Sequence, residues 1–342
     1  MIGLPQPART PAPVVVAPTR RVDWVDIAKG IAMLLVVLYH VCLVLVAKHL
    51  APSGWNQFNG VLEPLRMPLF MLTSGLFAQK MIRMAWVPVL RTRVALMLYL
   101  YAVWLVMFCV VHNLLPDDVR HKGYAHWSNL VTGLYFPANA LWYLYALAIF
   151  IVAAKLLSRM PVYAQLALAL ALSFWVQYDH FLRFPYTNFF EYFLYFMIGL
   201  HLRELVLGFA HRSTGWHVAI GTAAYAGLIV LKSELHFPAL KVAVSIVGIL
   251  TAVAAARRLE GTHLGEVTLR IGESTLPIFL MFDMWIAAWT WVFLRLPEFL
   301  GAPLVVTVLT VTAAMVTHRI LLRAHIRWLF ELPTMPSRRV NA

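Results

Sequence analysis

Residues 26–49 read DIAKGIAMLLVVLYHVCLVLVAKH, and this stretch decides the fold class. A run of about 20 mostly apolar residues is long enough for one α-helix to cross the hydrocarbon core of a membrane. Besides Lys48 and His49 at its end, the stretch carries Asp26, Lys29 and His40. Asp26 and Lys29 lie near its start, where a lysine can extend to the membrane interface, but His40 lies about 22 Å along the helix. His40 is therefore either a functional residue or a neutral histidine that hydrogen-bonds to a neighbouring helix.

The composition of the whole chain is that of an integral membrane protein. Of its 342 residues, 61% are hydrophobic and 13% are charged, with a mean hydropathy of +0.75, whereas soluble domains carry about 25% charged residues. We predict an all-α integral membrane protein with about ten transmembrane helices in a single bundle. The predicted spans are about 25–47, 60–80, 92–113, 137–157, 162–178, 188–206, 215–232, 239–256, 271–294 and 301–322.

The charged residues predict how the chain lies in the membrane. The 28 Lys and Arg residues give a net charge of +13 and are spread through connecting loops, which argues against a nucleic-acid partner. Most of them fall on the cytoplasmic side if the N-terminus is inside, as the positive-inside rule requires. We expect a multi-pass protein of the cell membrane with a disordered cytoplasmic tail (1–20), a transmembrane domain (21–330) and a second cytoplasmic tail (331–342).

Lys29 and His40 are 11 positions apart, which is three helical turns, so they share one face about 16 Å apart. This pattern suits a polyanionic cofactor that arrives from the cytosol and threads its reactive end into the bundle. A metal site is not predicted, because Cys42 and Cys109 lie in apolar runs and no histidines have the spacing of metal ligands.

The next segments add further polar candidates. Glu63 and Arg66 stand one turn apart at the outer start of the second span, either as an interfacial ion pair or as part of a site. Ser74 lies in the sequence TSGL, where small residues favour close helix packing. Arg91 and Arg93 belong to the cationic stretch KMIRMAWVPVLRTRV, which serves either topology and contact with anionic lipids or the recognition of phosphate.

Six stretches between residues 26 and 283 together resemble the membrane acyltransferase-3 family. They occur in the family's order and read DIAKGIAMLLVVLYH, MPLFMLTSGLF, RTRV, ANALWYLYALAIF, NFFEYFLYFMIGL and IGESTLPIFLMFD. Each is weak alone, but the ordered set covers most of the chain. Two positions depart from the family pattern: Lys29 stands where the family has Arg, and Asp283 stands where its last motif ends in His.

The resemblance implies transfer of an acyl group, often acetyl, from cytoplasmic acyl-CoA to a hydroxyl of an extracytoplasmic or lipid-linked glycan. His40 would be the catalytic residue, as general base or as transient acyl acceptor. Lys29, Arg91 and Arg93 would face the phosphates of CoA. No bound cofactor is implied, since acyl-CoA is the donor substrate.

The resemblance also suggests supporting roles. Asp26 would orient Lys29, and Asp283 would pair with His40. Glu63 and Arg66, with the outer loop 114–136, would lie on the side of the glycan or lipid-linked sugar acceptor.

Two other classes of function stay open from the residues. A secondary transporter or flippase for a glycan or lipid would use His40 as a proton site, although no internal repeat is visible in the sequence. A non-catalytic member that organises envelope assembly would account for the two departures at Lys29 and Asp283.

Overall fold

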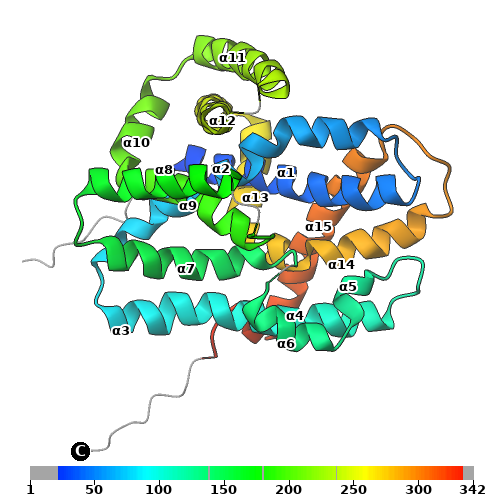
Figure 1. Cartoon of the computed structure of the whole chain (residues 1–342). Coiled ribbons are helices and arrows are strands. Elements are labelled where there is room, and N and C mark those ends of the chain that lie inside the picture. The colour runs from blue at the N-terminus through cyan, green and yellow to red at the C-terminus, as the bar shows by residue number, and fades with distance from the viewer. Residues whose placement is uncertain (1–21, 138, 179–180, 236, 334–342) are drawn as a thin grey trace, which may run out of the picture.

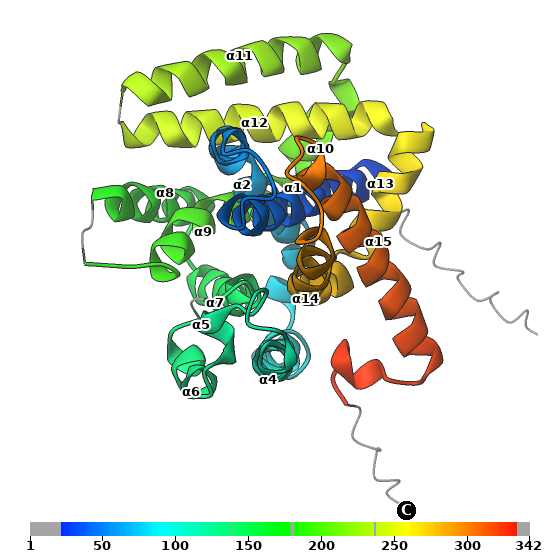
Figure 2. The same cartoon turned by 90° about the vertical axis from the view of Figure 1, so that its right-hand side faces the viewer.

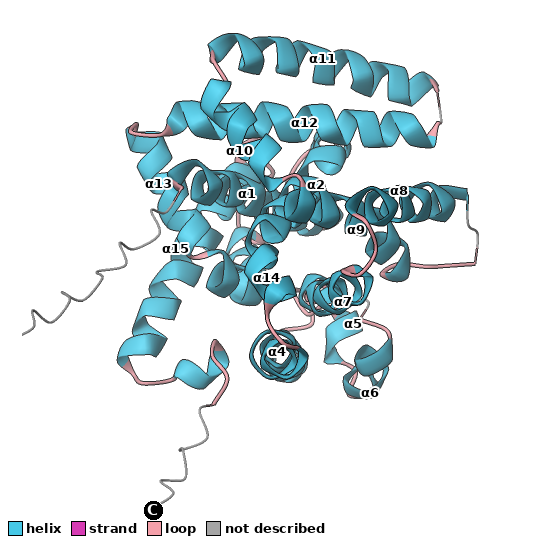
Figure 3. Ribbon diagram, turned by 90° about the vertical axis from the view of Figure 1, so that its left-hand side faces the viewer, coloured by secondary structure: helices cyan, strands magenta, loops and turns pink. Residues whose placement is uncertain are grey.

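The computed structural model describes residues 22–137, 139–178, 181–235 and 237–333, and all regular elements in these ranges are helices (Figures 1 and 3). The predicted tail 1–20 and most of the predicted tail 331–342 lie outside the described residues. The α-helices are α1 (Asp23–Ala47), α2 (Gly54–Arg83), α3 (Trp86–Val89), α4 (Ala95–Leu114), α5 (Lys122–Ala125), α6 (Ser128–Tyr135), α7 (Trp142–Leu157), α8 (Val162–Tyr178), α9 (Tyr186–His201), α10 (Arg203–Arg212), α11 (Gly215–Glu234), α12 (Pro238–Leu259), α13 (His263–Glu273), α14 (Thr275–Phe293) and α15 (Ala302–Arg323). A π-helical turn, η1 (Leu90–Val94), joins α3 to α4, and a 3₁₀ turn, η2 (Arg327–Leu329), follows α15.

The all-α membrane class is confirmed, whereas the count of about ten spans is not. Among the described residues, five helical segments are long and apolar enough to cross a membrane: α1, the segment Trp86–Leu114, α12, α14 and α15. A sixth span results if α9 and α10 count together, although they are bent by 75°. The apolar helices α7 and α8 are shorter.

Two predicted spans are interrupted by breaks that hydropathy does not reveal. The segment 188–206 ends its first helix at His201 and turns sharply into α10. The segment 271–294 is broken at Ser274, whose φ of −103° and ψ of 17° lie outside the helical region. Both interruptions are short changes of backbone direction within segments that are apolar on average, so a hydropathy pattern averaged over a long window passes over them.

Helix α1 lies at the centre of the bundle (Figure 2). It packs against α2, α12, α13, α14 and α15, and residues along its whole length, such as Trp24, Met33 and Leu45, are buried. The α11–α12 hairpin forms one flank of the molecule, and α4 with α6 forms the opposite flank. The N-terminus of α1 is tied down by Glu260, which accepts a hydrogen bond from the backbone N–H of Trp24 at 2.8 Å.

Two close helix crossings are made by glycines from the stretches IGESTLPIFLMFD and NFFEYFLYFMIGL. Gly272 of α13 lies against the backbone of α1 at Asp26 and Gly30, and Gly199 of α9 lies against α2 at Leu72 and Gly75. A methyl group at Gly272 would overlap the carbonyl oxygen of Asp26. Small residues allow helix backbones to approach in this way in a membrane, so these glycines hold α1 and α2 in place.

We expect Gly272→Ala to lower the free energy of unfolding by about 1–3 kcal/mol, because overpacking a close contact costs that much. Thermal unfolding of the purified protein in detergent measures the effect. Gly227→Ala on α11 is the matched control, since an added methyl meets no atom within 4 Å there. Equal melting temperatures for Gly272→Ala and wild type would contradict the role of the crossing.

Candidate active site

His40 has one ring nitrogen engaged by its own helix and the other available. Its Nδ1 lies 2.9 Å from the carbonyl oxygen of Val36, and a carbonyl only accepts, so Nδ1 carries the proton and donates. The lone pair of the neutral imidazole is therefore on Nε2. The ring is held between Tyr39 and Phe282, with ring centres 5.0 and 4.8 Å away. This arrangement is that of an oriented general base.

His40 lines a cavity of about 600 Å³, which we call the His40 pocket. Its walls come from α1, α2, α5, α7, α9 and the segments before α5, α7 and α9. The lining mixes amide and charged side chains with aromatic rings, the composition of a site for a polar ligand with hydroxyl groups. The polar members include Asn56, Asn59, Glu63, Arg66, Asn139 and Asn188, and the aromatic members include Tyr39, Tyr124, Trp142, Phe184 and Tyr192.

The structure brings Glu63 and Arg66 to the same pocket as His40, but not as an ion pair with each other. Glu63 lies 3.6 Å from Nζ of Lys241, which also contacts Glu191 at 2.8 Å. Of the two interpretations of these residues, the Glu63–Arg66 ion pair is not found among the described residues, whereas both side chains line a pocket. The guanidinium of Arg66 instead lies over the ring of Tyr39, with Cζ 3.9 Å from the ring centre.

Asp283 pairs with His112 of α4, so the expected pair with His40 is replaced. Nε2 of His112 lies 2.8 Å from Oδ2 of Asp283, and the backbone N–H of His121 donates to Nδ1 of His112 at 3.1 Å. Nδ1 must therefore be unprotonated, so His112 is neutral and donates from Nε2 to the carboxylate. The side chain of Asp283 stays within electrostatic range of His40 without a hydrogen bond to it.

The Asp283–His112 pair fixes a loop that forms part of the His40 pocket. His121, whose backbone is bound to His112, stacks on Tyr124 with ring centres 4.3 Å apart, and both side chains line the pocket. Burial lowers the pKa of His121, which favours its neutral form. Sequence reasoning missed His112, although the signal was the same as for His40: a histidine within an apolar segment.

Ser74 connects α2 to α7 through a hydrogen bond. Its hydroxyl donates to the carbonyl of Phe70 at 2.9 Å and therefore accepts from the hydroxyl of Tyr143, 2.5 Å away. The ring of Tyr143 packs on Phe279 of α14 with ring centres 5.4 Å apart. Three of the sequence motifs thus meet at one contact between α2, α7 and α14.

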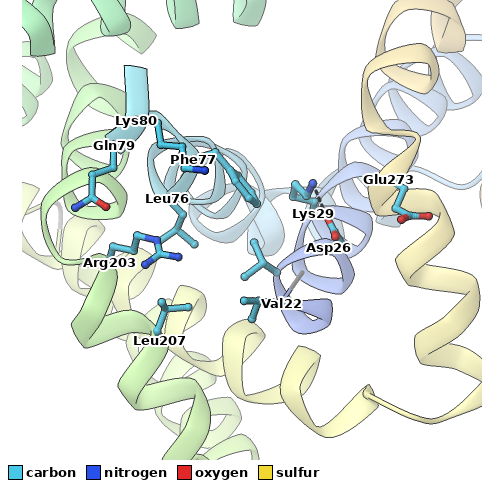
Figure 4. A pocket seen from close by; sticks show the side chains of 11 residues that line it. Val22, Asp26, Lys29, Leu76, Phe77, Gln79, Lys80, Arg203, Leu207 and Glu273 are labelled. Atoms are coloured by element: carbon cyan, nitrogen blue, oxygen red, sulfur yellow. Dashed lines mark ion pairs between the residues drawn. The ribbon is translucent and has the colours of Figure 1, made fainter. Parts of the chain in front are cut away.

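Lys29 lines a second cavity, of about 510 Å³, which we call the basic pocket (Figure 4). Asp26 forms an ion pair with Lys29, as expected, and the Lys29 amine also lies over the ring of Phe77 at 5.0 Å. Lys80 from α2 and Arg203 from α10 line the same space across from Lys29. Three cations from three helices therefore surround one cavity.

Arg91 and Arg93 do not line the basic pocket. Both are exposed on η1, the turn that begins the segment leading into α4. The positions beside Lys29 that the sequence analysis assigned to Arg91 and Arg93 are held by Lys80 and Arg203. Among the residues the structure describes, no group of three His, Cys, Asp or Glu side chains is arranged to hold a metal ion.

The two pockets lie at opposite ends of α1, on a face that Lys29 and His40 share. A family model for an acyltransferase domain matches residues 22–319, which include the described lining residues of both pockets. The chain belongs to this family, membrane acyltransferase-3, and is a membrane acyltransferase. Comparison with curated proteins and with solved structures gives no match.

We expect His112 and Asp283 to be energetically coupled in a double-mutant cycle. His112→Ala and Asp283→Ala should each destabilise the protein, because each leaves a buried partner unpaired. The double variant should be less destabilised than the two effects combined, by about 0.5–3 kcal/mol. Thermal unfolding in detergent measures all four proteins, and additive effects would contradict the pairing.

Proposed function

We propose that this membrane acyltransferase is an O-acyltransferase that moves an acyl group, acetyl in the simplest case, from acyl-CoA to a hydroxyl of a glycan or lipid-linked sugar. The observation that carries the proposal is His40, whose Nδ1–H is held by Val36 while Nε2 is left for a ligand in the His40 pocket. A fixed tautomer of this kind is what base catalysis on a hydroxyl requires.

The reaction follows from the position of the imidazole. Nε2 of His40 takes the proton of the acceptor hydroxyl while the hydroxyl oxygen attacks the thioester carbonyl carbon of acyl-CoA. The C–S bond then breaks, an ester forms, and the imidazolium returns the proton to the departing thiolate. The carbonyl of Val36 keeps the ring oriented and stabilises its positive charge during the transfer.

The basic pocket is the proposed binding site for the phosphates of CoA. Lys29, Lys80 and Arg203 supply the positive charge, and Asp26 holds Lys29 in place. Arg91 and Arg93, exposed at the same end of the bundle, are proposed to meet a phosphate farther out. The acyl end of the donor would then extend along α1 towards His40.

The distribution of charge supports a cytoplasmic position for the basic pocket. Arginine or lysine residues lie at this end of α2, α10, α12 and α15, and such residues concentrate on the cytoplasmic side of membrane proteins. We propose that the donor binds from the cytoplasm, that the termini lie on that side of the cell membrane, and that the His40 pocket opens towards the acceptor.

The role of His40 is tested by transfer of radiolabelled acetyl from acetyl-CoA to envelope glycans in membranes. His40→Ala should lower the rate by about 10²–10⁴, the usual contribution of a general base. His211→Ala on exposed α10 is the control and should retain wild-type transfer. Full transfer by His40→Ala would contradict the mechanism, and glycan flux without acyl-CoA would favour a transporter.

The donor site is tested by the Michaelis constant for acetyl-CoA. Lys80→Gln and Arg203→Gln should each raise it about tenfold or more, because a hydrogen bond to a charged group contributes about 1.5–3 kcal/mol. The rate at saturating donor should change little, since these residues contact the phosphates and not the reacting atoms. Arg295→Gln is the control, because Arg295 follows the end of α14 and does not line the basic pocket. An unchanged Michaelis constant in both test variants would contradict this placement.

A further inference from the structure

Arg66 is a buried cation of the His40 pocket that forms no ion pair with any residue in the described part of the chain. Its side chain is only 6% exposed, and its Nη1 has no hydrogen-bond partner among the described residues. Asn59, 4% exposed, lines the same wall, and its amide has only the weak thiol of Cys42 beside it. Burying a charge or an amide without partners costs free energy, so this wall is built to receive a ligand.

The carboxylates around the pocket are directed elsewhere. Glu63, one turn from Arg66, faces Lys241, and Glu191 binds the same lysine at 2.8 Å. Asp283 accepts from His112 at 2.8 Å. The face of the guanidinium is covered by Tyr39, which stabilises the cation but offers no anionic oxygen. Glu63 acts on Arg66 only as a longer-range electrostatic neighbour, and no described carboxylate lies within ion-pair distance of the guanidinium. A bound ligand can therefore supply the anionic oxygen.

Arg66 lies close to the proposed site of reaction. Its Cζ is 3.9 Å from the ring centre of Tyr39, which is 5.0 Å from that of His40, and these two distances keep the guanidinium within about 9 Å of the imidazole. A ligand of one sugar residue is large enough to present a hydroxyl to His40 and a second group to Arg66.

We infer that the acceptor carries an anionic oxygen group, a carboxylate or a phosphate, on or next to the sugar residue that is acylated. The group would bind Arg66 through charge-assisted hydrogen bonds, for which the guanidinium fork is suited. The amide of Asn59 would bind a neighbouring hydroxyl. This inference rests on the proposed function only in assigning the His40 pocket to the acceptor.

Binding is measured on the full-length protein in detergent without acyl-CoA, so the result does not depend on acyl transfer. The probes are methyl β-D-glucuronide for the carboxylate, glucose 1-phosphate for the phosphate, and methyl β-D-glucoside as the neutral match. Wild type should bind at least one anionic probe tenfold or more tightly than the glucoside. The anionic probe that binds more tightly shows whether the group is a carboxylate or a phosphate. Equal affinity for all three probes would overturn the inference.

Two variants assign the preference to Arg66. Arg66→Gln should remove the preference, so that the anionic probe binds no more tightly than the glucoside, and Arg66→Lys should retain part of the preference because the charge remains. The control is Arg295→Gln, since Arg295 lies over Trp291 at the same 3.9 Å but is exposed. Loss of preference in Arg295→Gln, or its persistence in Arg66→Gln, would overturn the assignment.

A separate measurement distinguishes failure of this inference from failure of the proposed function. If Arg66→Gln lowers the rate of acetyl transfer to neutral and anionic acceptors by the same factor, then Arg66 acts on the reacting carbonyl and the anionic acceptor is rejected, while acyl transfer stands. If the anionic probe binds through Arg66 but no acyl-CoA-dependent transfer occurs, the acceptor site stands and the acyltransferase mechanism is rejected.

Discussion

The structure depends on one constraint: the polar groups of α1 must find their partners inside the bundle, because hydrocarbon supplies none. Three ionisable residues of this helix, Asp26, Lys29 and His40, meet the constraint locally. Asp26 and Lys29 neutralise each other one turn apart, and His40 donates to the carbonyl of Val36 one turn back. Since these partners lie on α1 itself, the polar face remains open to the two pockets.

The close crossings of α1 and α2 with their neighbours fix the positions of the helices that line these two pockets. Gly272 brings α13 against the turn that carries Asp26 and Gly30, beside the basic pocket. Gly199 does the same for α9 against α2. Because α2 contributes Lys80 to one pocket and Arg66 to the other, its position relative to α1 sets the geometry at both ends of the molecule.

The sequence predicted the helical class and the shared face of Lys29 and His40, because both follow from hydropathy and the helical repeat. It did not predict which helices are interrupted, because the break after His201 is short and lies in a segment that is apolar on average. The sequence also could not predict contacts between residues far apart in the chain, such as His112 and Asp283, which are separated by 171 residues. Arg66 was found as a polar residue, but its burial over Tyr39 required the structure.

The two departures from the family pattern have different physical consequences. Lys29 lacks the bidentate fork of arginine, but the basic pocket adds Lys80 and the guanidinium of Arg203, so the charge is distributed over three helices. Asp283 exchanges an imidazole for a carboxylate, and His112 places an imidazole next to it from α4. The histidine that the last motif lacks is therefore present at this position in space, on another helix. Because it also binds the backbone of His121, it joins α14 to the loop that helps to form the His40 pocket, and this gives Asp283 a structural role in the site without direct contact with His40.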